Sequence, residues 1–127
     1  RRYQDFRIVD CEQTDDDDIQ AFEVTKEMLT EHPEIDAIFI VAGGVYGVCR
    51  AVISMHLEEQ MHIICFDSTP ASVEMIKKGV IQATICQQPF TQGNKSVHLA
   101  FNYLVSGLKP EKEYYFVKNE IKILENL

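Results

Sequence analysis

Residues 36–44 read Asp-Ala-Ile-Phe-Ile-Val-Ala-Gly-Gly, a continuous apolar run that stops at two adjacent glycines. A run of this length, rich in isoleucine, is typical of a strand that is covered on both faces of a parallel sheet. Gly43 and Gly44 permit a sharp turn, and apolar residues then recur at spacings of three and four from Val45 to Met55. The stretch therefore predicts a central strand followed by a helix.

The same alternation of strand and helix extends in both directions along the chain. The expected strands are residues 6–11, 36–42, 62–67 and 83–87, with a last extended segment at 114–122, and the expected helices are residues 15–32, 45–55, 69–79 and 89–107. Alternating elements of this kind require right-handed parallel crossovers. The sequence thus predicts an α/β fold, a doubly wound, mainly parallel sheet with helices on both faces. No linker interrupts residues 1–127, so we expect one unit.

Composition and charge exclude several classes of protein. The chain has 127 residues, 46% of them apolar and 25% charged, which is close to an average globular domain. Twenty acidic against 12 basic residues give a net charge of −8, a sign that repels nucleic acid phosphates. No window approaches 18 uninterrupted apolar residues, so no membrane-spanning segment is expected.

The four cysteines indicate free thiols. Cys11, Cys49, Cys65 and Cys86 form no Cys-x-x-Cys pair and match no zinc spacing, and each lies in or beside an apolar run. Buried free thiols are more typical of a reducing compartment, which predicts a cytoplasmic protein. The chain also begins without Met or a signal segment, so we expect it to be a piece of something longer.

Four consecutive aspartates, Asp15 to Asp18, allow two interpretations. Carboxylates at a helix N-terminus accept hydrogen bonds from free backbone N–H groups and oppose the helix dipole. A calcium loop would need spaced acidic residues and a glycine, a pattern that is absent here. We therefore expect a helix start and no metal site.

Ligands of doubly wound sheets bind outside the carboxyl ends of the strands. The residues expected there are Asp10 and Glu12 after the first strand, Gly43, Gly44 and Tyr46 after the second, Asp67 and Thr69 after the third, and Gln87 and Gln88 after the fourth. Carboxylates and amides suit hydroxylated neutral ligands, and an aromatic ring can cover a sugar face. The set lacks Arg and Lys, and the glycines match no nucleotide loop, so no cofactor is expected. The histidines lie away from this edge, which disfavours an enzyme.

Each candidate residue also has a structural interpretation. Asp67 is placed where it could cap the following helix, and Gln87 could be an ordinary loop residue. Gly43 and Gly44 form a tight turn in either interpretation, and Tyr46 could simply pack on its helix. For Asp10, a solvated loop position explains the residue without a ligand.

Two motifs carry a resemblance to a known family. Residues 64–70 read Ile-Cys-Phe-Asp-Ser-Thr-Pro, and residues 79–89 end in Cys-Gln-Gln-Pro, followed by Gln92-Gly93. This combination resembles type I periplasmic-binding-protein folds, including LacI-type transcriptional regulators, over nearly the whole chain. The resemblance implies that residues 1–127 are the C-terminal lobe of a two-lobed sugar-binding module. It also implies that Asp67 and Gln87 hydrogen-bond the ligand and that residues 89–109 pack on the missing N-terminal lobe.

One departure from the family pattern concerns the ligand. Many relatives carry a polar pair after the second strand, where this chain has Ala42-Gly43-Gly44. A usual polar contact is therefore missing. Tyr46, a neighbouring lobe or water remain as possible replacements.

Two functional hypotheses follow from the resemblance. The first is the effector-binding part of a cytoplasmic LacI-type regulator, a homodimer that binds a sugar and reaches operator DNA only through a headpiece absent from this chain. The alternative is a solute-binding protein of a sugar ABC transporter, which uses the same lobes and the same closure. A response-regulator-like domain ranks third, because no lysine directly follows the strand that ends at Gln87.

Overall fold

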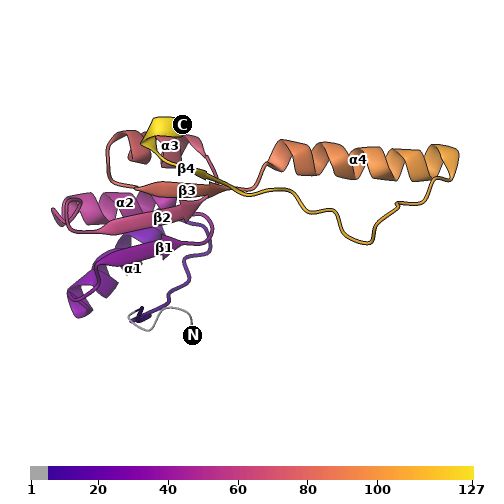
Figure 1. Ribbon diagram of the computed structural model, residues 1–127. Helices are drawn as coiled ribbons and strands as arrows, with labels where there is room; N and C mark the ends of the chain where they lie inside the picture. The colour runs from indigo at the N-terminus through magenta and orange to yellow at the C-terminus, as the bar shows by residue number, and fades with distance from the viewer. Residues whose placement is uncertain (1–5) are drawn as a thin grey trace.

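The computed structural model describes residues 6–127, which form a small α/β body and a helical arm that extends from one end of its sheet (Figure 1). The elements in chain order are α1 (Asp18–Glu31), β1 (Ala37–Ile40), α2 (Val45–Ser54), β2 (His62–Phe66), α3 (Pro70–Lys77), β3 (Ala83–Cys86), α4 (Pro89–Ser106), β4 (Glu120–Lys122) and a short 3-10 turn (Leu124–Asn126).

The sheet has the strand order β1-β2-β3-β4. The first three strands are parallel, with Ile40 opposite Cys65 and Phe66 opposite Ile85, and β4 is antiparallel to β3. The carboxyl ends of β1, β2 and β3 therefore meet at one edge, from which α4 departs (Figure 1). These observations confirm the expected α/β fold with a mainly parallel sheet.

Within the described residues the helices cover one face of the sheet. Helices α1, α2 and α3 pack with the strands into one hydrophobic core, whose fully buried members include Val52 and Ile63. On the opposite face Phe39 remains 54% exposed and Ile64 41% exposed. The expectations of helices on both faces and of a central strand at 36–42 are thus wrong here. The crossover from β1 through α2 to β2 and the crossover from β2 through α3 to β3 run in the same direction along the sheet. Both helices therefore lie on one face, and β1 is left at the edge.

Two further segments differ from the expected strands. Residues 6–11 form no strand, and Phe6 and Ile8 are exposed, because no segment within residues 6–127 pairs with them. The last extended segment is much shorter than residues 114–122, since only Glu120–Lys122 pairs with β3. A strand needs a hydrogen-bonded neighbour, which the hydrophobic pattern of a single segment does not reveal.

The predicted helix starts are confirmed in detail. Asp17 caps α1, and its Oδ1 accepts from the backbone N–H groups of Ile19 at 2.9 Å and Gln20 at 2.8 Å. Thr69 caps α3 through its Oγ1, which accepts from the backbone N–H of Ser72 at 3.2 Å. The acidic run therefore begins a helix. Among residues 6–127, no three His, Cys, Asp or Glu side chains are grouped in a way that would hold a metal ion.

Helix α4 leaves the body without packing on it. The chain turns at Gln88, whose φ of 55° lies in the left-handed region, and none of the residues of α4 is buried (Figure 1). Large apolar residues are exposed along the helix, namely Phe90, Val97, Phe101, Leu104 and Val105, whereas Leu99 is half-buried. Across residues 6–127, no helix combines the length and the apolar character needed to cross a bilayer.

Helices α1 and α2 approach each other closely at Gly47. The backbone N–H of Gly47 donates to Asp18 Oδ1 at 3.0 Å, and a Cβ at Gly47 would lie 2.0 Å from the backbone carbonyl oxygen of Asp18. Only a residue without a side chain fits at this crossing.

We therefore predict that Gly47→Ala lowers the free energy of unfolding by about 2 kcal/mol or more, because the helices must separate. The control is Gly93→Ala in α4, where nothing lies within 4 Å of the added methyl. That change should raise stability by at most about 1 kcal/mol. Urea denaturation measures both, and equal effects would contradict the close crossing.

The thiols differ in their environment. Burial, with smaller effects of Cys65 and Asp18, raises the pKa of Cys49 to about 12. Burial also raises the pKa of Cys65, whereas Cys11 is exposed. We predict that a thiolate-specific reagent at pH 8 labels Cys11 rapidly in the native protein and reaches Cys49 and Cys65 only in denaturant.

The same shifts predict a pH dependence of stability. Raised thiol pKa values stabilise the folded state fully below the ordinary thiol pKa of 9.0, and this contribution falls as the pH rises above that value.

The labelling experiment can contradict the burial of Cys49 and Cys65. It would do so if all four cysteines were labelled rapidly in the native protein.

Candidate ligand-binding site

Asp67 follows the last residue of β2 and is held by its backbone. Its φ of 65° is left-handed, and its N–H donates to the carbonyl of Ile85 at 2.9 Å. Its own carbonyl accepts hydrogen bonds from Ser72 Oγ and Thr84 Oγ1, each at 2.8 Å, and both hydroxyl side chains are fully buried. Thr69, and not Asp67, caps α3. The carboxylate of Asp67 is therefore not used by the helix and is available at the edge of the sheet.

Gln87 lies beside Asp67. It follows β3, and its Nε2 donates to Asp67 Oδ1 at 3.3 Å. The side chain of Gln92, in the first turn of α4, donates to the Gln87 carbonyl. The structure thus brings together a carboxylate and an amide from two adjacent strands, as the sequence predicts.

Gly43 and Gly44 form the loop after β1 and contribute backbone only. The N–H of Gly43 donates to Asp16 Oδ1 at 2.6 Å, and a Cβ at Gly43 would lie 2.6 Å from the Cβ of Asp16. Gly44 has a φ of 76° and precedes α2. Asp16 was not among the candidate residues. The signal for it was the acidic run itself, in which one carboxylate is enough to cap α1.

Tyr46 and Asp10 are not brought to Asp67 and Gln87. Tyr46 lines a small hollow of about 190 Å³ between α1 and α2, and the Arg50 guanidinium lies 6.0 Å from its ring centroid. The exposed Asp10 accepts from the N–H of its neighbour Cys11 at 2.7 Å. These positions agree with the structural interpretations of both residues.

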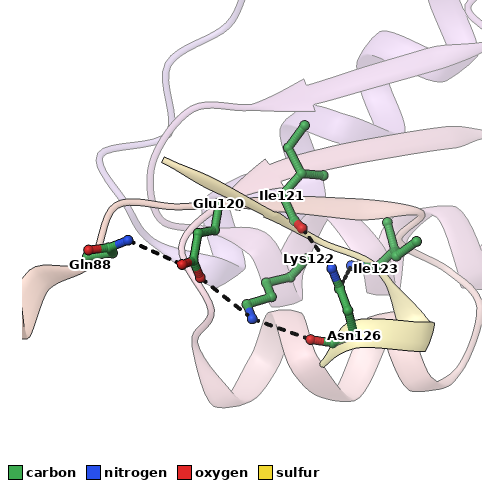
Figure 2. A network of polar contacts seen from close by, with 6 residues as sticks. All are labelled: Gln88, Glu120, Ile121, Lys122, Ile123 and Asn126. Carbon is green, nitrogen blue, oxygen red and sulfur yellow. Dashed lines mark hydrogen bonds and ion pairs between the residues drawn. The ribbon is translucent and has the colours of Figure 1, made fainter. Parts of the chain in front are cut away.

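Gln88 belongs to a different network, in which α4 is tied to the C-terminal segment (Figure 2). Its Nε2 donates to Glu120 Oε1 at 3.3 Å, and Glu120 pairs with Lys122 at 3.6 Å. Asn126 joins the network because its carbonyl accepts from Lys122 Nζ at 3.4 Å, and its side chain accepts from the N–H of Ile123 at 2.7 Å and donates to the Ile121 carbonyl at 3.1 Å. Gln88 thus helps to position the start of α4.

A larger hollow of about 540 Å³ lies between α4 and the segment that returns toward β4. It begins at Gln87 and is lined further out by Gln92, Lys95, Ser96, Leu99, Tyr115, Phe116, Val117 and Asn119. The Lys95 ammonium lies 4.6 Å from the ring centroid of Tyr115. No residue of α4 is buried, so this hollow is open space beside the arm and not an enclosed site.

Asp67 and Gln87 together offer carboxylate oxygens, an amide oxygen and an amide donor at one edge. Such groups bind hydroxyls in fixed directions, and a hydrogen bond to an ionised carboxylate is about twice as strong as a neutral one. This edge is suited to recognition of a polar, uncharged ligand.

The comparison with known proteins identifies the class. The periplasmic binding protein domain matches residues 1–109, so the chain belongs to this family. The fold expected from the two sequence motifs is thereby confirmed as one lobe of a type I periplasmic-binding-protein fold.

Individual relatives bind sugars according to their names. The chain is 29% identical over 110 residues to the ribose import binding protein RbsB of Salmonella typhimurium, which covers 86% of this chain and 36% of that protein. It is 29% identical to the glucose-galactose binding protein GanP of Geobacillus stearothermophilus, with a TM-score of 0.87 over 95% of this chain and 43% of that one. A periplasmic solute binding protein of an ABC transporter from Actinobacillus succinogenes, with bound D-allose, is 26% identical, with a TM-score of 0.87 over 98% of this chain and 43% of that one.

These comparisons correct the functional prediction. The interpretation as a LacI-type transcriptional regulator is contradicted, because the relatives are named as sugar-binding proteins, among them a ribose import protein and a solute-binding protein of an ABC transporter. The cytoplasmic location is contradicted for the same reason. Operator DNA and the homodimer were expected through the regulator resemblance and lose their basis with it. The relatives are named as binding proteins, and the expectation that this chain is not an enzyme stays a prediction.

The two hydrogen bonds that the Asp67 carbonyl accepts can be tested by mutation. Ser72→Ala and Thr84→Val each remove one of its two hydroxyl donors, and each should lower the free energy of unfolding by about 1 kcal/mol. The double variant should lose more than the sum, because the remaining hydroxyl compensates in each single variant. Urea denaturation of the four proteins gives the coupling, and additive losses would contradict a shared role.

Proposed function

We propose that residues 1–127 form the C-terminal lobe of a sugar-binding protein that delivers its ligand to an ABC importer outside the cytoplasm. The observation that carries this proposal is the pairing of Asp67 with Gln87 at the carboxyl edge of the parallel strands. The chain spans a little over a third of the length of the ribose-binding relatives, so the activity of the whole protein is part of the proposal.

The chemistry of the pair supports a sugar as the ligand. Adjacent hydroxyls of a sugar donate to a carboxylate and accept from an amide, and Asp67 and Gln87 present both groups side by side. The backbone of Asp67 is fixed by three hydrogen bonds, so little freedom is lost when its side chain binds a ligand.

The arm supports a two-lobed protein. Helix α4 exposes an apolar surface that includes Phe101 and Leu104. The hollow beside α4 starts at the end of the sheet, where Gln87 lines it. We propose that α4 and the rest of residues 89–109 pack on a second lobe and that the sugar lies between the lobes. Closure around the ligand then distinguishes the loaded from the empty protein for the transporter.

The proposal predicts the effect of removing either side chain. In the full-length protein, Asp67→Ala and Gln87→Ala should each weaken sugar binding by about tenfold or more, the effect of one lost hydrogen bond to a ligand. Isothermal titration with D-ribose, D-glucose, D-galactose and D-allose measures the dissociation constants.

The matched control is Asp36→Ala, which removes an exposed carboxylate at the opposite edge of the sheet, directly before β1. Its affinities should equal those of the wild type. A sugar that binds equally well to the Asp67 and Gln87 variants would disprove the site, and a wild type that binds none of the four sugars would disprove the function.

A further inference from the structure

The end of β1 carries no polar side chain of its own. The chain there reads Val41-Ala42-Gly43-Gly44, whereas β2 is followed by Asp67 and β3 by Gln87. One of the three parallel strands thus contributes nothing to the edge that the other two make polar.

Asp16 occupies the place left open by this loop. Its Oδ1 accepts from the N–H of Gly43 at 2.6 Å, and any side chain at Gly43 would collide with it. The Asp16 carboxylate therefore packs directly against the backbone of this loop. The segment before α1 passes the end of the sheet from which α4 departs, as Figure 1 shows.

The strand register and the bond to Gly43 place Asp16 at the same edge of the sheet as Asp67. Ile40 lies opposite Cys65, so the loop that follows β1 begins beside Phe66 and Asp67. Neighbouring strands are about 4.8 Å apart. Asp16 accepts from Gly43 in that loop, so the carboxylates of Asp16 and Asp67 both lie at the carboxyl edge, at the ends of two neighbouring strands.

Asp16 is not needed for the helix that follows it. Asp17 caps α1, and Asp18 accepts from Gly47 at the crossing with α2. Within residues 6–127, Oδ2 of Asp16 has no hydrogen-bond partner, and neither Asp16 nor Asp67 forms an ion pair. Two carboxylates without a facing cation remain available to a ligand.

We infer that Asp16 is a specificity-determining residue of the proposed sugar site, and this inference rests on the proposed function. Asp16 supplies the polar contact that Gly43 and Gly44 do not. Together with Asp67 it creates a negative field at the edge, which favours sugars with only hydroxyl groups and rejects sugars that carry a carboxylate or a phosphate.

The test compares neutral sugars with their anionic counterparts in the full-length protein. The pairs are D-ribose with ribose 5-phosphate, D-glucose with D-glucuronate and D-galactose with D-galacturonate. Asp16→Asn keeps an oxygen that accepts from Gly43 and removes only the charge. We expect it to weaken binding of the neutral sugar and to reduce its preference over the anionic sugar by about tenfold.

The control is Asp18→Asn, which makes the same change at a carboxylate that accepts from Gly47. Its affinities and its preference should match those of the wild type. Equal behaviour of the two variants, or a wild type that binds anionic sugars as tightly as neutral ones, would overturn the inference. If sugar binding requires Asp67 and Gln87 but not the charge of Asp16, only the inference fails. If no sugar binds, the proposed function fails with it.

Discussion

Three consecutive aspartates connect the start of α1 to the rest of the body, and much of the arrangement depends on them. Asp16 accepts from the N–H of Gly43, Asp17 caps α1, and Asp18 accepts from the N–H of Gly47. The two glycines allow the close approach that these bonds require. The acidic segment therefore fixes α1 against α2 and also shapes the loop after β1, which lies at the carboxyl edge of the parallel strands.

The sequence predicted those features that depend on local patterns. Caps at Asp17 and Thr69, the turn at Gly43-Gly44 and the positions of Asp67 and Gln87 follow from short-range spacing, and the structure agrees with them. Residues 6–11 and the covering of β1 depend on neighbours that spacing does not specify, and there the prediction was wrong. The contact between Asp16 and Gly43 joins residues 27 positions apart, so no local pattern predicts it.

The predicted compartment and the predicted functional class are wrong for separate physical reasons. The motifs at residues 64–70 and 79–89 specify how a strand meets a helix at a ligand edge, and both a regulator and a transport receptor use that edge in the same way. The predicted cytoplasmic location rests on free thiols, which are more typical of a reducing compartment. Cys49 and Cys65 are buried, and desolvation raises the pKa of each. A neutral thiol without solvent access resists oxidation, so the number of cysteines is a poor guide to location.

The uncovered face of the sheet affects how these residues can be handled as an isolated polypeptide. Among residues 6–127 no strand pairs with the outer edge of β1, and Phe39 and Ile64 form an apolar surface next to it. Unpaired edges beside apolar surface promote strand addition between molecules. A polypeptide of these 127 residues alone will tend to self-associate at the concentrations used for crystallisation, whereas covering this face would keep it monodisperse.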